Sequence, residues 1–424
     1  MKKEVTKLQK GLRGEITIPA DKSISHRAIM FNSIANGEAI VSNFSNGADC
    51  QSTLKVFQQL GIETNFIDEK TVKIKGGKLI KPKIELNCGN SGTTMRLISG
   101  ILSGQGFDSV LIGDSSLSKR PMKRIIEPLT KMGASITSNN NCAPLIIKGR
   151  NLHGINYESQ LSSAQVKSCI LLAGLFANGK TIYSEPNLSR NHTEIMLDYL
   201  GANIKTNGLL TNIEKSELIA KNIEVVGDIS SAAFFIVAGL IVEGSDFIIK
   251  NVGINPTRTG ILDVVKRMGG NIELLNIRTV SGELCADIRV QYSEDLRACE
   301  ISGSDIPRLI DELPIIAVLA SQASGETIIR NAGDLRNKES DRIKCLVQEL
   351  TKIGINIEEK DDGFVVYGKS KIAGNAELES YHDHRLAMSF YVAGLIAEKN
   401  ILINGFEWTN ISFPEFEKLM LSLQ

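Results

Sequence analysis

The sequence predicts an α/β protein of two lobes, each built from three repeated units in which apolar helices lie inside and strands lie outside. Two observations carry this prediction. A polar turn followed by an apolar helix, a glycine and a strand recurs six times, with a period of about 70 residues. Between these copies, a second helix repeatedly ends in an apolar residue plus glycine, after which a strand begins.

The first helix of each copy is rich in small and aliphatic residues on all sides. The stretch FFIVAGLIV (234–242) is the clearest example. A helix that is apolar all round is typical of a buried position, so the strands are expected to pack outside it. The six copies occupy 21–43, 89–114, 162–185, 227–252, 311–332 and 381–406.

The second signature marks the ends of five further helices. Glycine there suits the left-handed position that closes a helix, so each unit is expected to hold two helices and several strands. Three copies per lobe place the boundary between the lobes near 223–231. The five stretches are QLGIETNF (59–66), KMGASITS (131–138), YLGANIKT (199–206), RMGGNIEL (267–274) and KIGINIEE (352–359).

Composition narrows the classes of function. The 424 residues carry 48 basic and 48 acidic side chains, which gives no electrostatic reason to expect nucleic acid or an anionic membrane surface as a partner. No apolar region follows the charged N-terminus, and no apolar run is long enough to span a bilayer. The seven cysteines are scattered without a CxxC pair, which favours buried reduced thiols over a zinc site or disulfides. We therefore expect a cytoplasmic protein.

Cations stand at the starts of two buried helices, where the helix dipole disfavours them. Lys22 and Arg27 lie in DKSISHR (21–27), and Arg385 follows Asp383 and His384. Capping by small polar residues explains serines such as Ser230 and Ser231, but it does not explain these cations. An anionic ligand at the helix N-termini would explain them.

Two more basic clusters precede second helices. SKRPMKR (118–124) is one, and NKESDR (337–342) is expected to place Lys338 and Arg342 four residues apart on one helical face. Taken alone, either cluster is better interpreted as a solvated, charged helix face than as a ligand site. Asp311, Glu312 and Glu339 could supply an acid and a base if they face one cleft.

A search for three short motifs of other functions gives no support for those functions. GLFANGKT (174–181) matches the P-loop string, but it closes a helix and opens a strand, whereas a P-loop follows a strand and opens a helix. HDH (382–384) lacks a third metal ligand at suitable spacing. No GxGxxG follows a strand. We therefore expect neither a nucleotide cofactor nor a metal.

Several motifs together resemble the 5-enolpyruvylshikimate-3-phosphate synthase family of enolpyruvyl transferases, from one end of the chain to the other. The resembling segments, in family order and at family spacing, are DKSISHRA, GNSGTTMRL, KRPM, SAQVKS, NHTE (191–194), DELP, KESDR and DHR.

The resemblance implies a two-lobed inside-out α/β barrel in which each lobe holds three βαβαββ repeats with buried helices. It places the first strand in the second lobe. The first lobe is then 20–227, the second is 1–19 plus 228–424, and the active site lies in the cleft between them. It also implies a monomer without a cofactor whose small-molecule substrates are shikimate 3-phosphate and phosphoenolpyruvate, and which glyphosate inhibits as a phosphoenolpyruvate mimic.

Both substrates carry several negative charges, so the resemblance would account for the cations. It implies that phosphoenolpyruvate is bound by Lys22, Asn90, Gly92, Arg120, Gln165, Arg342 and Arg385. It implies that shikimate 3-phosphate is bound by Lys22, Ser23, Arg27, Ser162, Ser163, Gln165, Arg190, Asp311 and Lys338. Arginine suits such ligands because its planar fork pairs with carboxylate and phosphate through two hydrogen bonds.

The implied reaction is an addition followed by an elimination. The C3 methylene of phosphoenolpyruvate takes a proton while the 5-hydroxyl of shikimate 3-phosphate attacks C2, and the tetrahedral intermediate then expels phosphate. Asp311, Glu339 and Lys22 are the expected catalytic residues. As a hypothesis, Asp311 serves the 5-hydroxyl and Glu339 serves the methylene.

One departure from the family's sequence pattern and two alternative functions stay open. Ile411 stands where many members carry a lysine, which puts a C-terminal phosphoenolpyruvate contact in doubt. The sister transferase that acts on UDP-N-acetylglucosamine has Lys-Asn in place of Lys22-Ser23 and a cysteine in place of Ser115. A binding protein that has lost catalysis would lack an acid or a base, yet Asp311 and Glu339 are present.

Overall fold

The structure is a computed structural model that describes residues 1–424. The chain forms two compact units and passes from one to the other after residues 19, 226, 278 and 283. Unit 1 comprises 1–19, 227–278 and 284–424, and unit 2 comprises 20–226 and 279–283. No helix is long and apolar enough to cross a membrane.

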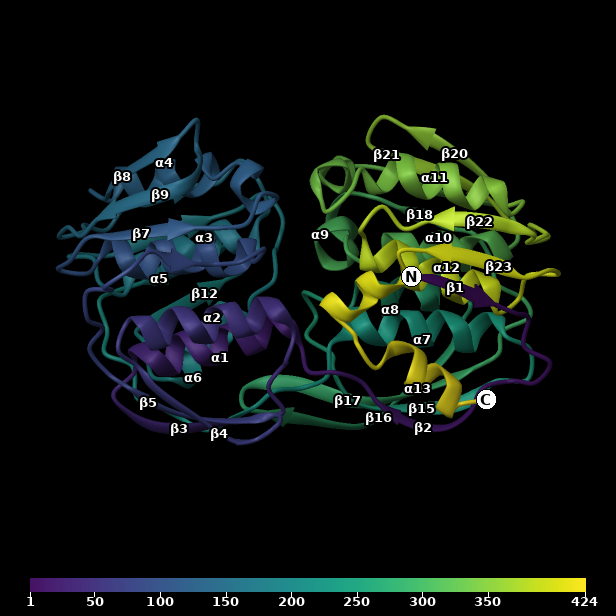
Figure 1. Ribbon diagram of the computed structural model, residues 1–424, viewed down its shortest axis with the longest axis horizontal. Coiled ribbons are helices and arrows are strands. Elements are labelled where there is room, and N and C mark those ends of the chain that lie inside the picture. Colours follow the sequence, from purple (N-terminus) through teal and green to yellow (C-terminus); the bar gives the residue numbers. More distant parts are fainter. The chain divides into compact units, whose positions relative to one another are not determined.

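Unit 2 contains three four-stranded sheets and the helices of the first three copies (Figure 1). The strand orders are β14-β3-β5-β4, β6-β7-β9-β8 and β10-β11-β13-β12. Its elements are α1 (Lys22–Ile34), β3 (Gly37–Ser42), α2 (Ala48–Gln59), β4 (Glu63–Asp68), β5 (Thr71–Gly76), β6 (Leu86–Asn87), α3 (Gly92–Ser103), β7 (Ser109–Ile112), η1 (Leu117–Lys119), α4 (Lys123–Lys131), β8 (Ser135–Asn139), β9 (Cys142–Lys148), β10 (Asn156–Glu158), α5 (Ala164–Gly174), β11 (Thr181–Ser184), α6 (His192–Tyr199), β12 (Ile204–Asn207), β13 (Leu210–Ile213) and β14 (Ile223–Glu224).

Unit 1 repeats this plan with two four-stranded sheets and one three-stranded sheet. The strand orders are β16-β17-β15-β2, β18-β19-β21-β20 and β1-β23-β22. Its elements are β1 (Lys2–Val5), β2 (Arg13–Thr17), α7 (Ile229–Ile241), β15 (Asp246–Gly253), α8 (Gly260–Arg267), β16 (Asn271–Val280), β17 (Glu283–Gln291), β18 (Glu300–Ile301), η2 (Gly303–Asp305), α9 (Ile306–Leu309), α10 (Leu313–Gln322), β19 (Glu326–Ile329), η3 (Gly333–Asn337), α11 (Arg342–Lys352), β20 (Asn356–Lys360), β21 (Gly363–Tyr367), β22 (Ala376–Glu379), α12 (His384–Gly394), β23 (Ile401–Asn404), η4 (Phe406–Ile411) and α13 (Phe416–Ser422). The turn of the β16–β17 hairpin, 279–283, is assigned to unit 2.

The six copies share one pairing scheme. The strand after each first helix pairs in parallel with one strand and antiparallel with another, as β7 does with β6 and β9. Two strands are exchanged where the chain crosses. β2 precedes α1 in the chain but pairs with β15 of unit 1, and β14 precedes α7 but pairs with β3 of unit 2.

The sixth copy departs from the expected plan. No strand follows its last helix, α13, so the copy lacks a third strand of its own. β1, from the start of the chain, pairs antiparallel with β23 instead, and Figure 1 shows the two side by side. The backbone groups of β23 on that side are thus paired, where an unpaired strand edge would be open to other chains.

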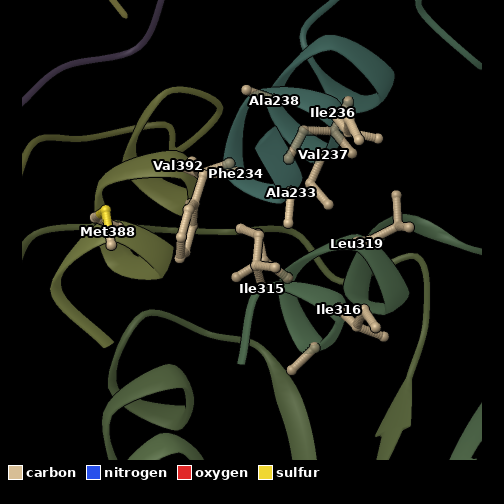
Figure 2. Packing of buried hydrophobic residues seen from close by; sticks show 14 of the residues in the cluster. Ala233, Phe234, Ile236, Val237, Ala238, Ile315, Ile316, Leu319, Met388 and Val392 are labelled. Carbon is tan, nitrogen blue, oxygen red and sulfur yellow. The ribbon is translucent and has the colours of Figure 1, made fainter. Parts of the chain in front are cut away.

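The expectation that the first helices are buried is confirmed. All residues of α7 except Ser231 are buried. Figure 2 shows its side chains, among them Phe234 and Val237, beside Ile315 of α10 and Met388 of α12. α7 can be apolar on every side because it faces either another helix or the sheet outside it.

The glycine signature is also confirmed. The five glycines after the second helices all have positive φ, between 79° and 95°. They are Gly61, Gly133, Gly201, Gly269 and Gly354. The P-loop string likewise lies where its context placed it, since α5 ends at Gly174 and β11 begins at Thr181.

Candidate functional site

The start of α1 carries Lys22, one of the predicted residues of unit 2. Asp21 caps this helix, and its carboxylate accepts a hydrogen bond from the backbone N–H of Ile24 at 2.8 Å. Lys22 begins the helix, and its Nζ lies 3.3 Å from Oδ2 of Asp49 on α2. The carboxylates near this ammonium group compensate it at an end of the helix that disfavours positive charge.

Arg27 is held rigidly by three hydrogen bonds. Its Nε donates to Thr193 Oγ1 at 2.7 Å, its Nη2 to Ser168 Oγ at 2.8 Å and its Nη1 to the backbone oxygen of Ser23 at 2.9 Å. The side chain is 3% exposed, and burial lowers the pKa of Arg27 to about 10, an effect that the carboxylate of Glu194 opposes. The guanidinium is therefore charged at neutral pH and fixed in direction.

Next to these partners of Arg27 in the chain are residues of a buried cluster of ion pairs. Lys167 is 1% exposed, and its Nζ contacts Glu185 at 2.8 Å and Glu194 at 2.7 Å. Burial raises the pKa of Glu194, and Lys167 counters this rise. Ser168 and Thr193, whose side chains accept hydrogen bonds from Arg27, belong to the SAQVKS and NHTE segments. Sequence reasoning matched both segments but gave Thr193 and Ser168 no role.

The GNSGTT loop forms the start of α3. Ser91 caps the helix, accepting from the backbone N–H of Thr94 at 3.1 Å. Asn90 is exposed, and its side-chain oxygen accepts from Arg120 Nη2 at 2.8 Å. A Cβ at Gly92 would lie 3.6 Å from Arg120 Nη1. The loop therefore brings together three residues that were predicted to contact phosphoenolpyruvate.

Arg96, one helical turn after Gly92, was missed. Its Nη1 donates to Gln165 Oε1 at 2.6 Å, and Gln165 Nε2 donates to Thr93 Oγ1 at 3.0 Å. A Cβ at Gly92 would lie only 2.9 Å from Arg96 Nη1, closer than real contacts allow. The i, i+4 spacing from Gly92 was the signal that could have drawn attention to Arg96.

The remaining predicted residues of unit 2 are Ser162, Ser163 and Arg190. Ser162 Oγ accepts from the backbone N–H of Asn187 at 3.0 Å. Ser163 occupies the N-cap of α5, but its side chain makes no capping hydrogen bond there. Arg190 lies near enough to Arg27 that its positive charge contributes to lowering the pKa of Arg27.

In unit 1, Arg342 is the centre of a group of carboxylates. It is 1% exposed, and its Nε donates to Asp383 Oδ2 at 2.7 Å while its Nη2 donates to Glu339 Oε2 at 2.6 Å. Its Nη1 lies 3.5 Å from Asp311 Oδ1. Burial alone would disfavour the charge, but the attraction of Asp383 and Glu339 outweighs it and raises the pKa of Arg342.

The expected helical face that pairs Lys338 with Arg342 is wrong. Lys338 follows η3 in an extended conformation, and α11 begins only at Arg342 because Asp341 caps it, accepting from the N–H of Lys344 at 3.1 Å. The two cations nevertheless approach the same acid. Lys338 Nζ lies 3.6 Å from Asp311 Oδ1, so Asp311 stands between two positive charges.

Arg385 joins this group from the start of α12. Asp383 caps the helix, accepting from the backbone N–H of Arg385 at 2.9 Å. Arg385 Nη1 donates to the backbone oxygen of Asp311 at 3.1 Å. The predicted residues of unit 1 are therefore neighbours through shared contacts with Asp311 and Arg342, and no group of three metal-ligating side chains occurs anywhere in the protein.

Comparisons with known proteins agree over nearly the whole chain. The family model described as EPSP synthase (3-phosphoshikimate 1-carboxyvinyltransferase) matches residues 6–420. The 3-phosphoshikimate 1-carboxyvinyltransferase of Endomicrobium trichonymphae is 50% identical over an alignment of 416 positions, which covers 96% of this chain and 96% of that protein. That of Petrotoga mobilis is 49% identical over an alignment of 432 positions, which covers 99% of this chain and 98% of that protein.

Solved structures give the same result. An EPSP synthase from Acinetobacter baumannii is 43% identical, with a TM-score of 0.91, and the match covers 100% of this chain and 98% of that one. The enolpyruvyl transferase NikO from Streptomyces tendae is 17% identical, with a TM-score of 0.82 over 99% of this chain and 96% of that one. At 17% identity, the similarity to NikO shows only a shared fold. Together these findings confirm the resemblance and the fold class predicted from the motifs.

Proposed function

The chain belongs to the EPSP synthase (3-phosphoshikimate 1-carboxyvinyltransferase) family, and from this premise we propose how its residues divide the reaction. The enzyme transfers the carboxyvinyl group of phosphoenolpyruvate to the 5-hydroxyl of shikimate 3-phosphate and releases phosphate. This transfer is a step of the shikimate pathway, which serves aromatic amino acid biosynthesis. Its substrates are small molecules, and the rival reading as a UDP-N-acetylglucosamine transferase is not favoured.

We assign the binding of phosphoenolpyruvate to one set of residues, with Lys22 and Gln165 shared between both substrates. That set is Lys22, Asn90, Gly92, Arg120, Gln165, Arg342 and Arg385. The set for shikimate 3-phosphate is Lys22, Ser23, Arg27, Ser162, Ser163, Gln165, Arg190, Asp311 and Lys338. Because the two sets draw on both units, the proposal requires both units to contact the same ligands.

The observation that best supports this assignment is the rigid support of the cations. Arg27 donates three hydrogen bonds to the protein, and Arg342 is fixed by Asp383 and Glu339. A guanidinium held in place before the ligand arrives loses less conformational entropy on binding, which favours tight recognition of a carboxylate or phosphate.

Asp311 and Glu339 are the proposed proton carriers. Addition puts a proton on C3 of phosphoenolpyruvate and removes one from the attacking 5-hydroxyl. Elimination removes a proton from C3 and expels phosphate. Asp311 is 15% exposed and touches two cations, which stabilises its ionised form as acceptor for the hydroxyl proton. Glu339 is 34% exposed and bound to Arg342, and it serves C3 in both directions. Lys22 supplies positive charge to the reacting groups.

Phosphate release measures this function directly. Purified protein given phosphoenolpyruvate should release phosphate with shikimate 3-phosphate and not with UDP-N-acetylglucosamine. Release with the sugar nucleotide alone would refute the assignment of the acceptor. We further propose that the enzyme acts as a monomer in the cytoplasm, which gel filtration with light scattering and cell fractionation would test.

A further inference from the structure

Unit 1 contains a buried carboxylate to which the proposed reaction gives no task. Glu312 is 1% exposed, and although it follows Asp311 in the chain, its partners are different. It accepts a hydrogen bond from Ser230 Oγ at the start of α7, and its Oε1 lies 3.8 Å from Arg385 Nη1. A side chain so deeply buried is poorly placed to exchange protons with a substrate, unlike the more exposed Asp311.

Arg258 shares the partner Ser230 with Glu312. Its Nη2 donates to Ser230 Oγ at 2.8 Å and to Asp228 Oδ1 at 3.0 Å. Arg258 is 4% exposed and Asp228 is 13% exposed. Negative and positive side chains thus alternate from Asp228 through Arg258 and Glu312 to Arg385, and their formal charges sum to zero. Such balance is what allows a charged carboxylate to remain buried beside Arg385.

The contacts of Arg385 show what the buried carboxylate can do. Nη1 is the only guanidinium nitrogen of Arg385 that makes a hydrogen bond or an ion pair with the protein, and its partners are the backbone oxygen of Asp311 and the carboxylate of Glu312. Nε and Nη2 donate to no protein group. This edge of the guanidinium has the geometry that binds a carboxylate or phosphate through two parallel hydrogen bonds.

We propose that Glu312 is a positioning residue for Arg385. Its negative charge holds Nη1 against α10, which directs the Nε–Nη2 edge toward the anion, while Ser230 and Arg258 hold the carboxylate in place. The proposal rests on the assignment of Arg385 to phosphoenolpyruvate binding. It gives the adjacent acids of the DELP segment separate tasks, since Asp311 serves the substrate and Glu312 serves an arginine.

The test is the effect of Glu312→Gln on the KM for each substrate. Glutamine keeps the size and the acceptor for Ser230 but loses the charge that attracts Arg385. Loss of one charge-assisted contact should raise the KM for phosphoenolpyruvate about tenfold. The KM for shikimate 3-phosphate should stay within about twofold, because Arg385 is not assigned to that substrate. Steady-state phosphate release with each substrate varied in turn measures both constants.

Glu349→Gln is the matched control. Glu349 is also a buried carboxylate of unit 1, at 0% exposed, but its partners are Lys352 and Tyr381 and not Arg385. The same change there should leave both KM values within about twofold. If the two variants raise the KM for phosphoenolpyruvate equally, the effect of Glu312 is a general loss of a buried charge and the positioning role is wrong.

A double-mutant cycle with Arg385→Ala decides whether Glu312 acts through Arg385. If it does, adding Glu312→Gln to Arg385→Ala should raise the KM for phosphoenolpyruvate no further. Multiplicative effects would overturn the proposal. If Arg385→Ala itself leaves that KM unchanged, the assignment of Arg385 fails and the positioning role falls with it.

A second variant covers the case in which Glu312→Gln does not fold. Ser230→Ala removes the hydroxyl that anchors the carboxylate but keeps both charges. It should raise the KM for phosphoenolpyruvate about threefold, again with little change for shikimate 3-phosphate. An unchanged KM for phosphoenolpyruvate in a folded Ser230→Ala variant would contradict the role of this anchor and the proposed geometry.

Discussion

Replacing Asp383 by asparagine should destabilise unit 1 strongly. The carboxylate is 0% exposed and accepts from Arg342 Nε at 2.7 Å, from Ser340 Oγ at 3.2 Å and from the backbone N–H of Arg385 at 2.9 Å. Asparagine keeps one oxygen, which can still cap α12, but it presents either an amide donor or a neutral acceptor to Arg342.

The size of the effect follows from what remains around Arg342. Removing one partner of a buried ion pair costs about 3–5 kcal/mol. Glu339 still binds Nη2 at 2.6 Å and Asp311 still lies 3.5 Å from Nη1, so Arg342 keeps part of its compensation. We therefore expect Asp383→Asn to lower the free energy of unfolding by about 2–3 kcal/mol at neutral pH.

The chain provides its own probe for this measurement. Trp408 is the only tryptophan, lies in unit 1 and packs on His382 with the ring centroids 4.5 Å apart. Urea unfolding followed by tryptophan fluorescence therefore reports on the unit that carries Asp383. Asp246→Asn is the control, because Asp246 pairs with Arg289 at the surface of unit 1 and should contribute far less. An effect of Asp383→Asn no larger than the control would refute the reasoning.

The pH dependence of the stability that Asp383 contributes has a defined sign. Burial alone would raise the pKa of Asp383, but the attraction of Arg342 outweighs it and holds that pKa below its ordinary value. An aspartate whose pKa is lowered by folding contributes stability that is fully present above its unfolded pKa, about 3.9, and is lost as the pH falls through the folded pKa. The difference between wild type and Asp383→Asn should therefore stay constant from pH 7 to about 5 and shrink below about pH 4. A gap that widens on acidification would contradict the assignment.

Four shorter predictions concern the reaction. Asp311→Asn and Glu339→Gln should each lower kcat about 100-fold with smaller changes in KM, and near-normal turnover of either would refute its role. Arg27→Lys, which cannot make all three contacts, should raise the KM for shikimate 3-phosphate more than that for phosphoenolpyruvate. Gly92→Ala should displace Arg96 and weaken competition by glyphosate more than it weakens phosphoenolpyruvate, and equal weakening would contradict this. Phosphate release should survive a metal chelator, and rescue by added metal would contradict a metal-free reaction.

Much of the fold could be predicted from sequence because its information is local and repeated. The apolar stretch 234–242 and the closing glycines each specify a helix or its end within a few residues. The exchange of β2 and β14 could not be predicted in this way. β14 is two residues long, and nothing in its composition indicates that it pairs with β3, about 180 residues earlier, instead of with β15, which follows it.

The same distinction holds for the site. The cations are conspicuous in the sequence, but the side chains that hold them are not, because the contacts join distant segments, such as Arg27 and Thr193, which are 166 residues apart. The misplaced Lys338 has a different cause. The charge spacing suggested a helix through NKESDR, although Asp341 carries the local signal of an N-cap and moves the helix start to Arg342.

The cations at helix starts have a second explanation that sequence reasoning did not weigh. Each of the helices α1, α11 and α12 carries a cation in its first turn and is capped by an aspartate, and the three pairs are Asp21 with Lys22, Asp341 with Arg342 and Asp383 with Arg385. A carboxylate at the N-cap offsets both the helix dipole and the nearby cation, so no ligand is needed to make these helix starts stable. An anionic substrate is therefore favoured by the rigid support of Arg27 and Arg342 and by the unused donors of Arg385, and not by the position of the cations at helix starts alone. Arg385 illustrates this, since its Nη1 is committed to the protein while its Nε and Nη2 donate to no protein group and face no competing carboxylate within ion-pair distance.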